Sequence, residues 1–310
     1  MNKSLNIRTR NQGFTLVELM ITLVLSLMIT YAIAQVLISS NRTSVTSDGM
    51  SQSQETGRFV MSYLAKQIRH AGLDHIDDQS VKTGAFISCK DFPDLADDNA
   101  CMAENAGGET ELTIVTPADP DRIHGDRLAI AWIPPADSLA DCTGNTGYWE
   151  TGKDPTIDPM IPYADKDTII NTFWVKYDLT SQMNSLFCQG FLLDGSDVLG
   201  ASTAQAIANG VEAMQLLYGE ASADLPLSGN RNISHYVPAP ADPNAPTATD
   251  VSNWDRVYAV KVSIMTRSIT DVTNSNALRS YVLANAAPYT MTDAVSRQVF
   301  TTTFALSNMP

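Results

Sequence analysis

The sequence predicts an α+β fold in which one long N-terminal helix packs on a mostly antiparallel β-sheet head with large irregular loops. Three observations lead to this prediction. The chain opens with a long apolar run, a helical pattern returns after a polar stretch, and segments rich in β-branched residues follow. Apolar residues make up 44% of the 310 residues, which is enough for a sizeable core.

The charge balance narrows the classes of function. The formal net charge is −14, from 34 acidic and 20 basic side chains. An acidic surface repels phosphate groups, so we expect no direct nucleic-acid binding. Only 17% of the residues are charged, which argues against a disordered acidic chain.

The N-terminal segment is the most informative part of the chain. Residues 1–13 are polar and basic, whereas the mostly apolar run from Phe14 to Ile38 carries a single charge, Glu18. At about 1.5 Å per residue, a helix over this run covers the roughly 30 Å hydrocarbon core of a bilayer. The basic residues before it should stay in the cytoplasm, so the rest of the chain should lie outside.

Two ordinary explanations of this segment compete. A secretory signal peptide would be cut after Ala34 and would release a soluble chain, but the apolar run is longer than a signal core and continues beyond Ala34. A plain single-span anchor leaves Glu18 unexplained, because a carboxylate within hydrocarbon costs several kcal/mol. Neither explanation accounts for the whole pattern.

A third explanation does account for the acidic residue. Residues 13–19, GFTLVEL, closely resemble the prepilin cleavage and methylation motif of type IV pilins and type II secretion pseudopilins. The resemblance implies that a prepilin peptidase cuts after Gly13 and N-methylates Phe14, so that the apolar helix is kept. It also implies that Glu18 pairs with the terminal amine of a neighbouring subunit. Such a pair would offset the cost of the carboxylate and set the register between subunits.

The helix is expected to continue well beyond the apolar run. No proline occurs before Pro93, and an apolar stripe at helical spacing returns from Phe59 to Ala71. Gly72 is a candidate C-cap. We therefore expect one helix over roughly residues 14–72, with fraying near residues 40–52 as the alternative to a continuous helix.

Two glycines within this helix, Gly49 and Gly57, are interpreted as weak points that each cost up to about 1 kcal/mol relative to alanine. The chain is then expected to have four parts. They are a cleaved leader at 1–13, a transmembrane or filament-core half-helix at 14–38, an amphipathic half-helix at 39–73 and a β-rich periplasmic head at 74–310.

The remainder of the chain predicts mostly β-structure. Strand candidates are Leu112–Thr116, Arg127–Ile133, Thr168–Leu179, Leu186–Leu193, Met214–Tyr218, Arg256–Arg267, Arg279–Leu283 and Gln298–Leu306. The run Tyr258–Ile264 alternates and should bury one face. A short helix over Ala204–Gln215 is an alternative, and the prolines between Gly219 and Trp254 predict a loop without central strands.

Four cysteines suit two disulfides in an oxidising compartment, and three pairings are possible. We favour the pairing of nearest neighbours. A Cys89–Cys101 bridge closes a short loop, and a Cys142–Cys188 bridge ties a loop to a strand. In the chain-entropy model each bridge contributes on the order of 3 kcal/mol.

One segment matches most of a phosphate-binding loop, from Gly147 to Lys153. The next residue should be serine or threonine, but Asp154 occupies the position, and its carboxylate would repel a phosphate. We therefore interpret the segment as an ordinary loop. No nucleophile, base and acid combine into a catalytic triad, so we expect no enzyme.

No metal or cofactor site is expected either. The histidines His70, His75, His124 and His235 lack the spacing of a zinc site and suit surface or capping roles. The aspartate-rich patches between residues 74 and 121 do not fit an EF-hand loop. A calcium-binding loop remains the weaker alternative.

Three segments of the C-terminal half are similar to the PilW branch of minor pilins: Asn209–Gly219, Trp254–Val262 and Arg297–Asn308. This chain has Ser307 where that branch usually has arginine, so no role of that arginine is carried over. The resemblance implies a minor pilin of the initiation or tip complex of a type IV pilus, which supports adhesion, twitching motility and DNA uptake.

The same resemblance implies the partners and the location. The partners would be other minor pilins, the major pilin, the prepilin peptidase, the inner-membrane assembly platform and a tip adhesin. The chain would span the inner membrane once, with its head in the periplasm, and would reach the tip of the pilus, or fimbrium. The alternatives are a minor pseudopilin of a type II secretion system and, from another class, a secreted periplasmic binding protein or enzyme cleaved after Ala34.

Overall fold

The computed structural model describes residues 13–73, 124–134, 140–150, 161–162, 168–194, 197–222, 231–240, 248, 250–272 and 277–308. Two compact units make up the chain. The N-terminal unit is Met1–Asp48, and the C-terminal unit is Gly49–Pro310. The fold class expected from the sequence is confirmed, since one long helix is followed by antiparallel sheets.

Helix α1 (Leu16–His70) has a defined cap at each end. At its start, the hydroxyl oxygen of Thr15 accepts a hydrogen bond of 3.2 Å from the backbone N–H of Glu18, which satisfies one of the unpaired donors of the first turn. At its end, Gly72 has a φ of +73°, a left-handed conformation that suits glycine. The expected C-cap is therefore confirmed.

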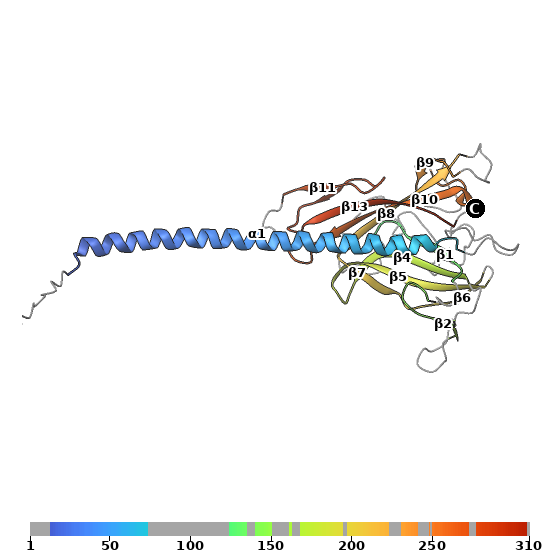
Figure 1. The fold of residues 1–310 in the computed structure, drawn as a ribbon, viewed down its shortest axis with the longest axis horizontal. Helices are drawn as coiled ribbons and strands as arrows, with labels where there is room; N and C mark the ends of the chain where they lie inside the picture. The colour runs from blue at the N-terminus through green and yellow to red at the C-terminus, as the bar shows by residue number, and fades with distance from the viewer. Residues whose placement is uncertain are drawn as a thin grey trace, which may run out of the picture. The chain divides into compact units, whose positions relative to one another are not determined.

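The C-terminal unit contains two antiparallel sheets (Figure 1). The first sheet has the order β1-β4-β5-β6-β2-β3, and β7 also pairs with β5. Its strands are β1 (Leu128–Trp132), β2 (Gly147–Glu150), β3 (Ile161–Pro162), β4 (Thr168–Asp178), β5 (Met183–Asp194), β6 (Asp197–Ala201) and β7 (Gln205–Asn209).

The second sheet has the order β13-β10-β8-β9. Its strands are β8 (Val211–Ala221), β9 (Ile233–Val237), β10 (Val257–Arg267) and β13 (Arg297–Ala305), and a short 3-10 helix, η1 (Trp254–Arg256), leads into β10. A separate hairpin of β11 (Arg279–Tyr281) and β12 (Tyr289–Met291) contributes Tyr289 and Met291 to a small cluster with Met265 of β10. Both faces of β10 are therefore buried, and the expectation of one buried face was wrong.

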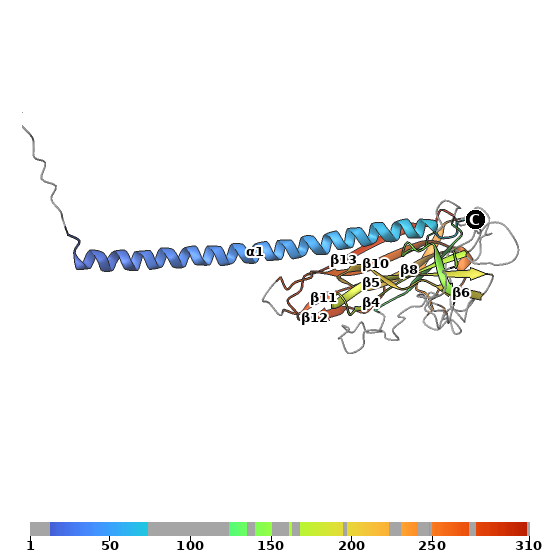
Figure 2. The ribbon, with the colours of Figure 1, turned by 90° about the horizontal axis from the view of Figure 1, so that it is seen from below.

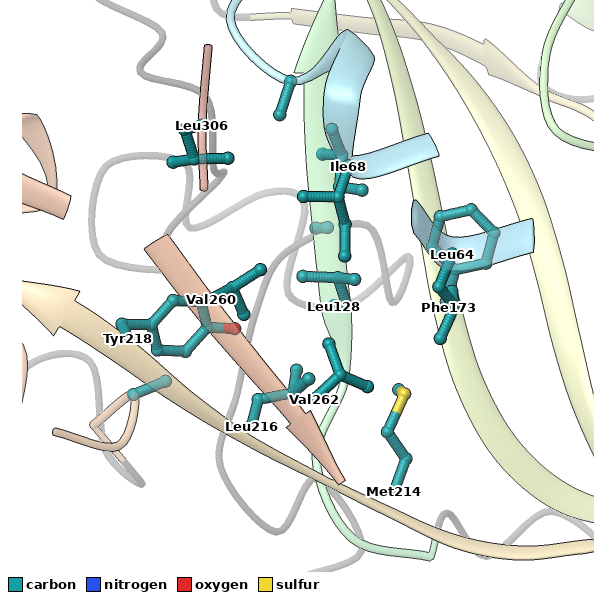
Figure 3. Close-up of a cluster of buried hydrophobic side chains, with 14 of the residues drawn as sticks. Leu64, Ile68, Leu128, Phe173, Met214, Leu216, Tyr218, Val260, Val262 and Leu306 are labelled. Atoms are coloured by element: carbon teal, nitrogen blue, oxygen red, sulfur yellow. The ribbon is translucent and has the colours of Figure 1, made fainter. Parts of the chain in front are cut away.

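The main core lies between the two sheets and the end of α1. Leu64 and Ile68 of α1 join Phe173 of β4 and Val260 of β10, and all four side chains are fully buried (Figure 3). In both ribbon views this part of α1 runs beside β13 (Figures 1 and 2). Burying such side chains stabilises the fold by about 1.5–3 kcal/mol each, which joins the helix to both sheets.

One segment belongs to both sheets. Gly125 forms a parallel bridge with Met214 of β8, and a few residues later β1 pairs with β4 of the first sheet. Gly125 has a φ of +81°, and a Cβ atom there would overlap the carbonyl oxygen of Met214. The carboxylate of Asp126 accepts a hydrogen bond of 2.6 Å from the backbone N–H of Leu216. Glycine is therefore required for this close approach.

Most strand candidates were correct in type and position, with ends that differ by a few residues. The short helix over Ala204–Gln215 was wrong, because Gly210, with a φ of +77°, separates β7 from β8. In the described residues between Gly219 and Trp254, no new central strand follows β8, but β9, on the edge of the second sheet, was missed. The candidate Leu112–Thr116 lies outside the described residues.

Candidate functional site

The processing bond expected from the sequence lies just before α1. Gly13 and Phe14 precede the first helical residue, and nothing lies within 4 Å of a Cβ atom placed on Gly13. The side chain of Phe14 is 80% exposed. Among the described residues, this bond lies outside the helix.

The carboxylate of Glu18 lies in the first turn of α1. The positive end of the helix dipole favours a negative group at this position by about 0.3–1 kcal/mol at an exposed site. Within the described part of the chain, no ion-pair partner accompanies the Glu18 side chain. The described side chains therefore supply no counter-charge for this carboxylate.

The N-terminal unit exposes its apolar side chains all around the helix. The exposed large side chains include Phe14, Leu16, Val17, Leu19, Met20, Ile21, Leu23, Val24, Leu25, Leu27, Met28, Ile29, Tyr31, Ile33, Val36, Leu37 and Ile38. Of the described helices, α1 alone is long and apolar enough to cross a membrane. A surface of this kind is stable only against lipid or against other apolar helices.

The C-terminal half of α1 presents a stripe of small residues to the second sheet. Gly49, Ser53 and Gly57 are four residues apart and all buried. A Cβ atom on Gly49 would overlap the side chain of Val272, and one on Gly57 would overlap the ring of Phe300. The interpretation of these glycines as weak points was therefore incomplete, because they allow the helix to approach the sheet closely.

Between the two glycines, Ser53 forms a buried polar contact with β10. Its hydroxyl lies 2.8 Å from the hydroxyl of Thr266, which also donates a hydrogen bond of 3.0 Å to the Ser53 carbonyl oxygen. Sequence reasoning missed this stripe. The spacing of small residues at i, i+4 and i+8 was the available signal, because such residues share one helix face.

The end of α1 is held by polar contacts from distant parts of the chain. The hydroxyl of Tyr63 donates a hydrogen bond of 2.7 Å to the carbonyl oxygen of Cys142, and burial, followed by the charge of Asp141, raises the pKa of Tyr63 to about 12. The side-chain amide of Asn308 donates to the carbonyl oxygens of Arg69 and Ala71, at 2.7 and 3.2 Å. The last turn of the helix is thereby tied to the C-terminal residues.

The structure contains a disulfide between Cys142 and Cys188, with their Cα atoms 6.3 Å apart. It joins the loop before β2 to β5, and the backbone N–H of Cys142 donates a hydrogen bond of 3.0 Å to the side-chain oxygen of Asn171 in β4. Cys89 and Cys101 lie outside the described residues. Their pairing therefore stays a prediction.

A buried ion-pair network joins β8 to β13. Arg297 donates two hydrogen bonds to Glu212 and two to Asp293, and Arg267 lies 3.6 Å from Glu212. Burial lowers the pKa of Arg297, but the carboxylates of Asp293 and Glu212 outweigh this effect and raise it. The hydrogen bonds from Arg297 lower the pKa of Asp293. The arginine is therefore a fixed structural cation.

The histidines take up separate structural positions. The ring of His70 stacks on Trp132 at 4.7 Å, and burial lowers its pKa. The ring of His235 lies 3.6 Å from Glu220, and His124 is buried. His75 lies outside the described residues, as do the aspartate-rich patches. Among the side chains that the structure does describe, no three His, Cys, Asp or Glu residues form a metal-binding group.

The segment that resembles a phosphate-binding loop is in part a strand. Residues Gly147–Glu150 form β2, so the interpretation as an ordinary loop was wrong for this portion. It pairs with β3 and β6, which explains its aromatic content. Lys153 and Asp154 lie outside the described residues.

Comparisons with known protein families match two separate parts of the chain. Residues 8–30 match the prokaryotic N-terminal methylation motif, and residues 172–308 match the type IV pilus-assembly protein W family, PilW. The chain is therefore similar to PilW-type pilus-assembly proteins in its C-terminal half, and it carries a prepilin-type methylation motif at its N-terminus. The PilW match includes β8, β10 and β13 of the second sheet, and the methylation motif includes Gly13, Phe14 and Glu18.

The match fits a membrane-anchored pilin that interacts with other pilins and with the pilus machinery. Domains of this kind are structural components rather than enzymes. Searches of curated proteins and of solved structures found no significant match to the chain.

Proposed function

We propose that this PilW-type pilin is a minor pilin of type IV pilus assembly, in the initiation or tip complex, and supports adhesion, twitching motility and DNA uptake. One observation carries the proposal. The N-terminal unit is an apolar helix whose large side chains are exposed and whose first turn holds a single carboxylate, Glu18. Such a helix can be kept in the membrane and later packed among the helices of other pilins.

The maturation steps follow from the same arrangement. A prepilin peptidase removes residues 1–13 by cutting after Gly13 and then methylates the amine of Phe14. The new amine belongs to Phe14, four residues before Glu18, and a neighbouring subunit presents the same two groups. An ammonium group of the neighbour next to Glu18 offsets the cost of burying the carboxylate and fixes the axial position of the two subunits.

The remaining parts of the chain then take defined places. Residues 14–38 anchor the pilin in the inner membrane, residues 39–73 carry the head, and the head at 74–310 lies in the periplasm and at the fimbrial tip. Its partners are other minor pilins, the major pilin, the inner-membrane assembly platform and a tip adhesin. A periplasmic location also suits a second disulfide between Cys89 and Cys101.

The mature N-terminus provides the decisive test. Mass spectrometry of the purified chain should give N-methyl-Phe14 as the first residue. A chain that begins at Gln35 would contradict the proposal and would support a secreted periplasmic protein instead. The Gly13→Ala variant is expected to keep its leader, and normal maturation of that variant would also contradict the proposal.

A gene deletion distinguishes the pilus from a secretion system, because both use the same type of N-terminus. We expect loss of surface pili and of twitching with normal protein secretion. Loss of secretion with normal pili would instead identify a minor pseudopilin of a type II secretion system. Complementation with the wild-type chain is the control for the deletion.

A further inference from the structure

Strand β13 forms one edge of the second sheet. It pairs with β10 on one side, and no strand of the described chain pairs with its other side. The strand is nine residues long, and Thr301, Thr302 and Thr303 are exposed. A long edge of this kind leaves backbone donors and acceptors open to another chain.

The register shows which backbone groups face outward. The backbone N–H of Leu306 donates to the carbonyl oxygen of Tyr258 at 2.9 Å, and the N–H of Ser268 donates to that of Ser296 at 2.8 Å. The pairing between β10 and β13 has no register shift between these points. In an antiparallel pair, hydrogen-bonded positions alternate with positions whose N–H and C=O groups point away. The groups that point away from β10 are those of Val299, Thr301, Thr303 and Ala305.

Natural edge strands are usually protected by lysine, proline, a bulge or a buried charge that points inward. β13 has no lysine, no proline and no bulge. Its one charged residue, Arg297, is bound to Glu212 and Asp293 and so is not available to repel another strand. The edge from Gln298 to Ala305 is therefore uncharged.

We propose that the outer edge of β13 is a docking site for an extended strand of a different protein of the pilus machinery, which adds to the second sheet by backbone hydrogen bonds. This inference rests on the proposed function. Charge argues against a second copy of this chain, because two whole chains that each carry a net charge of −14 repel each other. The partner strand is uncharged or basic, with β-branched residues that suit the threonine-rich edge.

A synthetic peptide of the same length as β13 can serve as the probe. Its sequence alternates valine and threonine between terminal lysines, and a control peptide carries N-methyl groups on alternate backbone nitrogens. We expect the first peptide to slow amide hydrogen exchange of Val299, Thr301, Thr303 and Ala305 in the full-length chain in detergent by about tenfold or more. Gln298, Phe300, Thr302 and Phe304 should be protected with or without the peptide.

Thr303 offers a matched pair of variants. Thr303→Pro removes an outward N–H and should abolish the added protection, because proline is tolerated on edges but cannot donate a hydrogen bond. Thr303→Ala keeps the N–H and should behave as the wild type. No binding of the lysine-ended peptide, equal binding of the N-methylated peptide, or protection in Thr303→Pro that equals the wild type would overturn the inference.

Assays in cells complete the test. We expect Thr303→Pro to reduce piliation, whereas Thr303→Ala should not, and the thermal unfolding of both variants shows that they fold. Normal piliation of the Thr303→Pro strain would overturn the docking site. It would not overturn the proposed pilin function, which is supported separately if the deletion strain lacks pili. Sedimentation tests for a second copy of the chain as the occupant. If the wild-type chain forms dimers and Thr303→Pro disrupts them, the occupant is a second copy and the inference is overturned.

Discussion

The side-chain amide of Asn308 donates a hydrogen bond of 2.7 Å to the carbonyl oxygen of Arg69, in the last turn of α1. A second hydrogen bond, of 3.2 Å, reaches the carbonyl oxygen of Ala71. The final carbonyl groups of a helix have no partner within the helix, so a side-chain donor at this point stabilises the last turn. The C-terminal residues of the chain therefore serve as the cap of its N-terminal helix.

Replacing this cap should destabilise the last turn of α1. Asn308→Ala removes both hydrogen bonds and is expected to lower the free energy of unfolding by about 1 kcal/mol. Denaturant unfolding of the mature chain in detergent measures the change. Ser307→Ala, at an exposed neighbouring position, is the matched control and should leave stability unchanged. Equal stability of the two variants would show that the cap contributes nothing.

The contact between Gly57 and Phe300 can be tested by whether Gly57→Ala raises or lowers the free energy of unfolding. Alanine at an ordinary helix position stabilises relative to glycine by up to about 1 kcal/mol. At Gly57 the added methyl group overlaps the ring of Phe300, so Gly57→Ala should destabilise by about 1–3 kcal/mol instead. Thermal or denaturant unfolding measures the change.

A double-mutant cycle provides the control for this contact. In the Phe300→Ala background the ring is absent, so Gly57→Ala should cost less than in the wild type. Ser51→Ala, on the exposed side of α1, reports helix propensity alone. A Gly57→Ala variant that is more stable than the wild type would contradict the close packing of α1 on β13.

The Cys142–Cys188 bridge should contribute to stability through the loop it closes. The sequence separation is 46, and the chain-entropy model then gives about 4 kcal/mol. The Cys142→Ala and Cys188→Ala double variant should lose stability of this order, and wild-type chain treated with a reductant should approach the variant. Stability that is insensitive to reductant, with both thiols free by alkylation, would rule the bridge out.

The ion pair of Asp293 with Arg297 predicts a loss of stability in acid. Hydrogen bonds from Arg297 hold the pKa of Asp293 below its ordinary value of 3.8, so the folded state releases this proton more readily than the unfolded state. The stabilisation is fully present above about pH 4 and is lost as the pH falls through the lower pKa of the folded state.

Asp293→Asn measures this effect. The variant should be less stable than the wild type near neutral pH by roughly 0.5–1 kcal/mol, because the pair is partly exposed. The difference should shrink as the pH falls below about 4. Asp271→Asn, at an exposed position, should follow the wild type. A constant difference between Asp293→Asn and the wild type across this range would contradict the assigned pair.

Substitutions of Glu18 can distinguish the effect of its charge from its effect on the first turn of the helix. Glutamine suits this position of a helix cap as well as glutamate does, but it is uncharged. Glu18→Gln and Glu18→Ala should both be inserted and cleaved, and both should fail to support piliation. Glu18→Asp retains the charge and should support partial piliation. Wild-type pili in the Glu18→Gln strain, counted by electron microscopy, would refute the role in subunit register.

Sequence patterns were sufficient wherever the cause of the structure is local. The apolar run and the stripe after Phe59 predicted α1, and runs of β-branched residues predicted β4, β10 and β13 with small errors at their ends. The resemblance at residues 13–19 also identified Gly13, Phe14 and Glu18 as candidate site residues. These features depend on neighbours in the sequence, which is why a pattern can predict them.

Contacts between distant residues could not be predicted in the same way. Nothing near Gly57 in the sequence indicates that Phe300 will lie against it, and the cap of Arg69 comes from a residue 239 positions away. The network of Arg297 with Glu212 likewise appears only when β8 and β13 lie in one sheet. The role of each residue here is set by tertiary packing rather than by local preference.

The segment from Gly125 to β1 is hydrogen-bonded to β8 of one sheet and to β4 of the other. Separating the two sheets would require this single stretch of chain to break its bonds on one side, with the buried side chains between the sheets exposed at the same time. We therefore expect the two sheets to unfold in one cooperative transition rather than one after the other. Within the described residues, a force applied to one sheet would therefore be passed to the other through this segment.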